Sequence, residues 1–219
     1  MRAKLFAGLV ATFALAGLSA PAAAQAKPTR VAVAVMDFDY GTLDHWWGTY
    51  DIGKGMADQV VDGLVNDGTF RVIERKKLDT VLAEQDFSKS DRADPSAAKL
   101  SKLGKVLGVK YIIAGSITRF STKKRGAGVR VKGVGLGGGK AKSIVSLTAR
   151  MIDTTTGEIV LSAKGEGDSN KGGDVNFSTG GVAAGTNAEE WRNSGLGEAQ
   201  EKACTALVAA FVARKDRVQ

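Results

Sequence analysis

Apolar and polar residues alternate with two different periods along the chain, and these periods predict its strands and helices. Residues 30–39, RVAVAVMDFD, are nearly continuous in apolar and β-branched side chains. Such a run is typical of a strand buried on both faces. In the next segment apolar residues recur every four positions, at Ile52, Met56, Val60 and Leu64. This stripe predicts a helix that begins near Asp51 and ends at Gly68.

A short strand and two more helices are predicted next. Residues 69–75, TFRVIER, read as a strand, and the following KKLDTVLAEQDF reads as a helix with Leu78, Val81 and Leu82 turned inward. Asp94 and Pro95 are expected to start a third helix, because Asp caps helices and Pro suits the first helical position. The apolar stripe of that helix is Leu100, Leu103 and Leu107, and Gly108 ends it.

The second half of the chain predicts three strands and a closing helix. Residues 109–120 form the first strand, and residues 142–153 form the second, in which Val145, Leu147, Ala149 and Met151 alternate with polar residues. The chain turns at Thr156–Gly157 and returns, so this pair predicts an antiparallel hairpin with one solvent-exposed face. The closing helix carries one apolar side, made of Leu196, Ala199, Ala203, Leu207, Ala210 and Phe211.

The order of these elements predicts an α/β fold, a mixed sheet flanked by helices. Two stretches interrupt this plan, residues 121–142 and residues 167–187, and both are long, Gly-rich and polar. Loops of such length inside a compact domain are usually functional or disordered. Each lies between segments that pair as strands. Each is therefore interpreted either as a long Gly-rich β-hairpin extension or as a flexible loop.

The first 26 residues predict a secretory signal peptide. Arg2 and Lys4 make a basic start, an apolar run follows over residues 5–18, and Ala24-Gln25-Ala26 fits a cleavage site. The run is short for the alternative, an N-terminal membrane anchor. No Cys follows the small residues, so a lipoprotein is not predicted. Residues 27–219 are expected to form one exported domain in the periplasm, with association to the outer membrane as an option.

Charge and cysteine usage narrow the range of partners. The chain carries 31 Lys and Arg against 23 Asp and Glu, and removal of Arg2 and Lys4 lowers the net charge from +8 to 29 − 23 = +6. Export argues against nucleic acid, and so does the spread of the basic residues, apart from the run at residues 123–125. The charge is interpreted as a solvated surface or as attraction to an anionic envelope surface or an acidic client. The single Cys204 forbids an intramolecular disulfide and is interpreted as a small buried hydrophobe.

No motif in the chain predicts an enzyme, a cofactor or a metal. GVGLGG at residues 133–138 matches G-x-G-x-x-G, but a strand follows it where a dinucleotide site needs a helix. GGGK at residues 137–140 lacks the first Gly and the Ser or Thr of a phosphate-binding loop. One His and one Cys make neither a metal cluster nor a Ser-His-Asp set. The pair Asp37 and Asp39 is a candidate for acid–base chemistry, although acids at a strand end are more often solvated.

The two Gly-rich stretches carry a weak alternation of the kind seen in membrane-spanning strands. In the first stretch Val129, Val131, Val134 and Leu136 alternate with polar or Gly positions, with one slip at Lys132–Gly133. In the second stretch Val175, Phe177 and Val182 alternate less clearly. A membrane strand needs about 9–11 residues. Against this interpretation, a Lys or Arg that faces lipid at mid-bilayer costs about 2–4 kcal/mol. The chain also has no aromatic girdle, and Phe120 and Phe177 are the nearest candidates.

An aromatic cluster, DHWWGTYDIG at residues 44–53, lies between the first strand and the first helix. It holds Trp46, Trp47 and Tyr50 beside the only His of the chain. No other residue supplies that His with a catalytic partner. The cluster is interpreted either as bulky packing between helix and sheet or as a set of aromatics that narrows a channel when copies assemble.

Several segments, in order and at fitting spacings, resemble the CsgG family of curli assembly and transport components of Gram-negative bacteria. They include FRVIERKKLDTVLAEQ, LGKVLGVKYIIAGSITRF, GAGVRVKGVGLGG and IVSLTARMIDTTTGEIV, and the resemblance spans residues 30–212. It implies an α/β periplasmic domain with two membrane hairpins, in subunits that form an outer-membrane ring through which unfolded amyloid subunits diffuse. It also implies that residues 41–51 form the constriction loop of the channel, with Trp46, Trp47 and Tyr50 as its aromatics.

Two functions remain open at this point. The first is an oligomeric, curli-type secretion channel subunit whose partners are further copies in a ring and unfolded secreted protein subunits. The second is a soluble periplasmic scaffold or binding protein that uses the same domain without a pore. Two departures from the family pattern bear on this choice, because the lipidated Cys is missing and the Gly-rich stretches are unusually basic. An enzyme, the third class, has no supporting set of residues.

Overall fold

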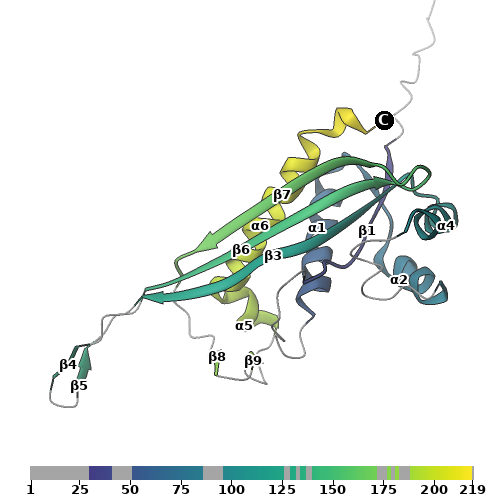
Figure 1. Ribbon diagram of the computed structural model, residues 1–219. Helices are drawn as coiled ribbons and strands as arrows, with labels where there is room; N and C mark the ends of the chain where they lie inside the picture. The colour runs from purple at the N-terminus through teal and green to yellow at the C-terminus, as the bar shows by residue number, and fades with distance from the viewer. Residues whose placement is uncertain are drawn as a thin grey trace, which may run out of the picture.

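A five-stranded sheet with helices on both faces forms the body of the protein (Figure 1). The computed structural model describes residues 30–40, 51–85, 96–125, 129–131, 134–136, 140–171, 177–178, 181–182 and 188–218. The five strands stand in the order β2–β1–β3–β6–β7, where β1 pairs in parallel with β2 and β3, and the remaining pairs are antiparallel. Their bounds are Ala32–Val35 for β1, Arg71–Val72 for β2, Tyr111–Arg125 for β3, Lys140–Asp153 for β6 and Ile159–Ser169 for β7. The predicted mixed α/β sheet is confirmed.

Two hydrophobic clusters fill the two sides of this sheet. The first packs the helices α1 and α6 against β3, β6 and β7, and the second packs α2 and α4 against the other face of β1 and the start of β3. The helices run over Ile52–Asp67 for α1, Arg75–Glu84 for α2, Ala97–Leu107 for α4, Ala188–Asn193 for α5 and Gly195–Val212 for α6, followed by a 3-10 turn at Lys215–Arg217. Because α2 and α4 cover only one end of the second face, the rest of that face stays open.

The helix ends follow the sequence signals closely, with one exception. The Asp51 carboxylate caps α1, and Gly68 and Gly108 end α1 and α4 with positive φ angles of 77° and 66°. The predicted start of the third helix at Asp94 and Pro95 is wrong, because α4 begins at Ala97 with Ser96 as its N-cap. The Ser96 hydroxyl accepts a hydrogen bond from the Lys99 amide at 3.4 Å, a role that Ser fills as well as Asp does. Asp94 and Pro95 lie outside the described residues.

The predicted apolar stripes are buried as expected. Every predicted inward residue of α2, α4 and β6 is at most 6% exposed, and so are those of α6, except that Ala210 is half-buried. Cys204 is buried on α6, as predicted, and burial raises the pKa of its thiol to about 12. The thiol therefore stays protonated and unreactive at neutral pH.

Beyond the end of β1, the strands β3, β6 and β7 continue as a three-stranded antiparallel extension. One face of it packs on α6, and the other carries polar side chains, among them Thr148, Lys164 and Glu166. This open polar face confirms the predicted hairpin with one solvent-exposed side. A β-bulge between Ile117 and Arg119 turns Thr118 and Arg119 outward and keeps the following Phe120 in the core.

The described parts of the two Gly-rich stretches include the outer ends of β3, β6 and β7. They also include two short strand pairs, β4 (Val129–Val131) with β5 (Val134–Leu136) and β8 (Phe177–Ser178) with β9 (Gly181–Val182). The slip noted at Lys132–Gly133 has a structural counterpart in the pairing of these strands. Val131 stands opposite Val134, so β4 and β5 are two strands that pair with each other, and the slip falls between them. The long hairpin extensions are not confirmed and stay a prediction.

Candidate functional site

The neck of the aromatic loop is a set of hydrogen bonds that holds the two ends of residues 41–50 together. The Tyr40 hydroxyl donates to the Asp51 carboxylate at 3.4 Å and accepts from the Gly53 amide at 3.4 Å. The Phe38 amide donates to the Gly53 carbonyl at 3.2 Å. These bonds join the segment after β1 to the first turn of α1. The predicted constriction residues Trp46, Trp47 and Tyr50 lie outside the described residues, and their role stays a prediction.

The Tyr40 hydroxyl is held as a protonated donor. Its pKa is raised, first by burial and then by the negative charge of Asp51, while bonds from the Gly53 and Ile52 amides act in the opposite direction. A phenol with a raised pKa keeps its proton at neutral pH, so it can donate to the carboxylate. The neck therefore does not open by titration of Tyr40 near neutrality.

A glycine at position 53 lets the helix start approach the chain that leaves β1. A side-chain Cβ at this position would clash with the Phe38 carbonyl oxygen. Gly115 on β3 makes a similar approach, because a Cβ there would clash with the Phe38 ring. The Phe38 side chain is 2% exposed. Its carbonyl lies against Gly53 and its ring lies against Gly115. This packing fixes the position of the first turn of α1 relative to the chain that follows β1.

Replacing Asp51 with alanine is expected to lower the free energy of unfolding by about 1 kcal/mol, the usual loss of a helix N-cap. The Asp51 carboxylate accepts from both the Lys54 amide, at 3.0 Å, and the Tyr40 hydroxyl. The Asp51→Asn variant keeps the capping oxygen and serves as the matched control. Urea unfolding followed by circular dichroism measures the difference. Equal midpoints for the Ala and Asn variants would contradict the capping role.

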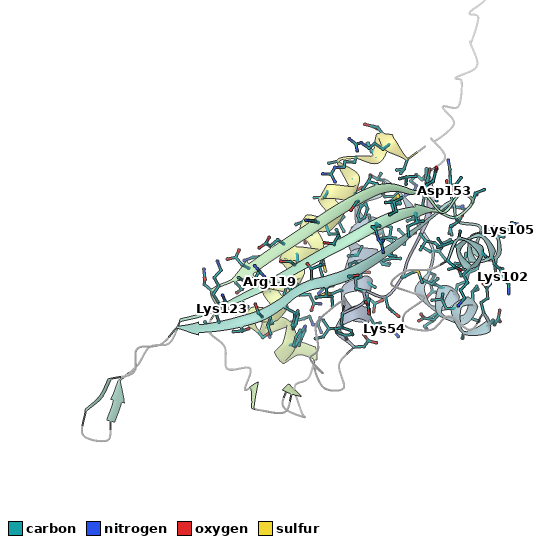
Figure 2. The ribbon with its side chains drawn as sticks, viewed as in Figure 1. Lys54, Lys102, Lys105, Arg119, Lys123 and Asp153 are labelled. Atoms are coloured by element: carbon teal, nitrogen blue, oxygen red, sulfur yellow. The ribbon has the colours of Figure 1, made fainter. Side chains whose placement is uncertain are left out.

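The two Gly-rich stretches begin and end on neighbouring strands at one end of the sheet. Lys123 of β3 stands opposite Lys142 of β6, and Ser143 of β6 stands opposite Ser169 of β7. The Thr122 and Ser143 hydroxyls share a hydrogen bond of 2.9 Å, and Lys142 pairs with Asp168 at 3.2 Å. Figure 2 shows Arg119 and Lys123 along β3 on the way to this end. The structure thus brings the bases of both stretches side by side.

A polar network ties the start of the second stretch to α6. The Ser169 hydroxyl donates to Glu198 at 2.9 Å and accepts from the Lys171 amide at 3.0 Å. The Lys202 ammonium donates to Glu198 at 2.6 Å and to the Asp168 carbonyl at 3.1 Å. The pKa of Glu198 is lowered, first by its hydrogen bond from Lys202 and then by that from Ser169. The carboxylate therefore stays ionised at neutral pH and keeps both bonds.

An aromatic stack fixes the other end of the second stretch. Trp191 of α5 stacks on Phe120 of β3 with ring centroids 5.9 Å apart and an interplanar angle of 7°. Phe120 is 5% exposed and Trp191 is 4% exposed, so both belong to the core. Phe120, one of the two nearest candidates for an aromatic girdle, is therefore a core residue. The sequence interpretation did not include Trp191 in the core. Its position just before the closing helix was the one sequence feature that could have indicated this role.

The described residues contain neither a group of three His, Cys, Asp or Glu side chains placed to bind a metal nor a helix long and apolar enough to cross a membrane. The candidate acid–base pair, Asp37 and Asp39, lies where the chain leaves β1. The Asp39 backbone there bonds to β3, since its amide donates to the Gly115 carbonyl and its carbonyl accepts from the Ile117 amide. These two backbone hydrogen bonds extend the pairing of the β1 segment with β3 as far as Asp39.

A family model described as the curli production assembly/transport component CsgG matches residues 15–216. The chain belongs to the CsgG family. The match covers the sheet, all helices of the described chain and both Gly-rich stretches, so it confirms the resemblance seen in the sequence. No curated protein sequence matches the chain.

Solved structures share the architecture at low sequence identity. The hypothetical protein CT253 from Chlamydia trachomatis is 13% identical, with a TM-score of 0.51 over 82% of this chain and 94% of that one. The lipoprotein GNA1162 from Neisseria meningitidis is 14% identical, with a TM-score of 0.48 over 66% of this chain and 88% of that one. PelC from Paraburkholderia phytofirmans is 16% identical, with a TM-score of 0.44 over 84% of this chain and 90% of that one. The first of these supports the fold of this CsgG-family chain and nothing beyond the fold.

Proposed function

We propose that this CsgG-family protein is a subunit of an oligomeric, curli-type assembly component of the cell envelope. Its copies bring their Gly-rich stretches together at the outer membrane, where they surround a path for unfolded secreted subunits. The observation that carries this proposal is the common origin of both stretches at one end of the sheet, on the neighbouring strands β3, β6 and β7. A ring of copies would place all these ends at one side.

The geometry of β3 suits this arrangement. Asp39, just after β1, forms a bridge to Ser116, and β3 continues from there for nine residues to Arg125. At about 3.3 Å per residue, the extension carries the bases of the stretches roughly 30 Å beyond the bridge. The helical layers can thus stay in water while the stretches reach a membrane.

The register of the first stretch also supports the proposal. Three residues separate β3 from β4, and three separate β5 from β6, so the β4–β5 pair keeps the register of the β3–β6 pair. Arg125 stands opposite Lys140 and, further along, Val129 stands opposite Leu136. Residues 121–131 number eleven, which is about the length that a transmembrane strand needs. The edge strands of a hairpin in lipid need neighbouring strands that pair with their backbone N–H and C=O groups. Hairpins of further copies would supply these strands.

The neck of the aromatic loop, at Tyr40 and Asp51, also suits this arrangement. It lies at the carboxyl end of β1, and β3 runs parallel to β1 toward the bases of both stretches. In a ring, the necks from all copies would lie toward the same side. This supports Trp46, Trp47 and Tyr50 as the residues that narrow the path.

A second candidate function is a periplasmic scaffold without a pore. The observation in its favour is the basic character at the base of the first stretch, where Lys123 and Lys142 are exposed and directly opposite each other. Lys and Arg that face lipid near mid-bilayer cost about 2–4 kcal/mol each, so a deep position for this part would be unfavourable. Under this alternative the stretches stay in water and contact protein partners.

Fractionation of cells that express the full chain separates the two functions. The channel form predicts recovery of the protein in the outer-membrane fraction, where it resists extraction by salt. Recovery of all protein in the soluble periplasmic fraction would contradict the channel form and favour the scaffold.

Removal of the two tryptophans from the loop tests the constriction directly. The double variant Trp46→Ala/Trp47→Ala is expected to raise the single-channel conductance of the purified assembly in planar bilayers, because two bulky rings per copy leave the narrowest part. The matched control is Trp191→Phe, which changes a Trp of the core. Conductance that stays at the wild-type value in the double variant would remove both residues from the constriction.

A further inference from the structure

Two helices on opposite sides of the sheet expose stripes of opposite charge. On α1 the outward positions include Asp58, Asp62 and Val65, and on α4 they include Lys102, Lys105 and Val106. The helix α1 belongs to the cluster on one face of the sheet, and α4 belongs to the cluster on the other. The two stripes therefore lie on helices whose buried sides cover opposite faces of the sheet.

The α1 stripe is a cluster of like charges. Burial raises the pKa of Asp58, and the nearby Asp62, Asp79 and Asp51 act in the same direction against the lowering effect of Lys54. Lys54, at the start of the stripe, pairs with Asp79 of α2 at a distance of 4.0 Å. Lys54 thus also contacts α2, and no Lys or Arg follows it in the helix sequence, whose next two turns present Asp58 and Asp62.

The α4 stripe is wholly basic. The helix sequence AAKLSKLGKVL contains three lysines and no acid, and its leucines are buried against the sheet. Lys102 and Lys105 lie on the side away from the sheet (Figure 2). Three lysines on successive turns repel one another, so a surface that carries acids would be bound favourably.

Each stripe also exposes one valine. In the part of the chain that the structure describes, only three large hydrophobic side chains are exposed, and two of them are Val65, at 55%, and Val106, at 51%. Val65 follows Asp62 by three residues, and Val106 follows Lys102 by four, so each valine shares the face of its charges. The two stripes are therefore complementary. Each exposes one valine, and the acidic charges of the α1 stripe are opposite in sign to the basic charges of the α4 stripe.

We propose that the α1 stripe of one copy docks on the α4 stripe of the next copy, so that the occupant of each surface is a second copy of this chain. Because two different surfaces of the subunit meet, the contact is head-to-tail and leaves one free stripe at each end. Such contacts close into a ring when their rotation closes. This inference rests on the proposed oligomeric function and assigns the surface that builds the oligomer.

The outer edge of the sheet at β7 is less suited to join copies. The Arg214 guanidinium donates to the Ser162 carbonyl at 2.9 Å, and the Lys202 ammonium donates to the Asp168 carbonyl at 3.1 Å. Cationic side chains placed on edge carbonyls block pairing with a strand of another chain. The other edge strand, β2, has two residues and offers a very short ladder. Helix faces are the better route to assembly.

A charge exchange tests the contact in the full-length protein, purified in mild detergent. The single variants Asp62→Lys and Lys102→Glu should each raise the concentration at half-assembly by about tenfold or more, because each places like charges across the contact. An equimolar mixture of the two variants should assemble again, since the new lysine on α1 of one variant then meets the new glutamate on α4 of the other. The double variant Asp62→Lys/Lys102→Glu should also assemble.

The controls Glu166→Lys and Lys164→Glu make the same charge changes on the open face of β7, away from α1 and α4, and should assemble as wild type does. Sedimentation velocity measures all variants. Singles that assemble as wild type does, or a mixture and double variant that stay dissociated, would overturn this contact while the oligomeric function stands. A wild-type protein that stays monomeric at every concentration would overturn both proposals.

Discussion

Replacing Gly165 with valine is expected to lower the free energy of unfolding by about 3 kcal/mol, at the upper end of the usual cost of overpacking. Gly165 of β7 lies directly under α6, and a Cβ there would clash with the Ala203 carbonyl oxygen and stand 2.8 Å from the Leu207 Cβ. The obstructing atoms include helix backbone, which cannot rotate away. The helix would have to lift from the sheet and give up part of its buried contacts. Urea unfolding at equilibrium measures the loss.

The matched control for this variant is Ser162→Val on the same strand. Ser162 is exposed on the open face, and valine suits a strand, so its stability should stay within about 0.5 kcal/mol of wild type. Equal stability of the Gly165→Val and wild-type proteins would show that α6 does not approach β7 as closely as described. The second glycine on this strand, Gly167, makes the same approach to the Ala199 carbonyl and should respond in the same way.

Replacing Trp191 with alanine is expected to cost about 3–5 kcal/mol, the usual range for a buried aromatic residue. Trp191 stacks on Phe120 and lies just before α6, so its loss opens a cavity between α5 and β3. It also releases the chain at the end of the second Gly-rich stretch. Limited proteolysis should then cut residues 172–187 faster than in wild type.

Phenylalanine at position 191 separates stacking from the other properties of tryptophan. The Trp191→Phe variant keeps a ring on Phe120 and should lose clearly less stability than the alanine variant. If both variants lose the same amount, the stack is not the source of the stabilisation. If neither variant loses stability, the burial of Trp191 against β3 is contradicted.

Much of the fold follows from local signals in the sequence. The stripe from Ile52 to Leu64 and the alternation around Leu147 each specify one buried face, because a helix and a strand repeat with fixed periods. Helix ends were equally clear where a glycine adopts a left-handed conformation, as at Gly68 and Gly108. These features depend on residues close together in the chain.

The parts that sequence analysis missed depend on residues far apart. Trp191 and Phe120 meet across 71 positions, and Gly165 is required by the backbone of a helix some 40 residues later. The periodic pattern of apolar residues within one helix or strand does not indicate such contacts between distant elements. The start of α4 was misplaced because Asp94 and Ser96 are both good caps and only the folded chain shows which one binds the helix amides.

The candidate site was predictable only in part. The sequence placed Trp46, Trp47 and Tyr50 between a strand and a helix, and Asp51 near the helix start. It contained no sign that Tyr40 would bind Asp51 and close the neck of that loop, because this contact needs the fold of both flanking elements. The common origin of the two Gly-rich stretches, in contrast, follows from the predicted antiparallel hairpin of β6 and β7, because the first stretch ends where β6 begins and the second begins where β7 ends.

The size of the protein complex extracted from outer membranes tests the central claim most directly. The measurement is the mass of the full-length protein, solubilised from isolated outer membranes in mild detergent, by mass photometry. The proposed function predicts one discrete species whose protein mass is a whole-number multiple, of three or more, of the mass of one chain. A protein absent from the outer membrane, or one that leaves it as single chains, would contradict the claim that this CsgG-family protein works as an assembled ring.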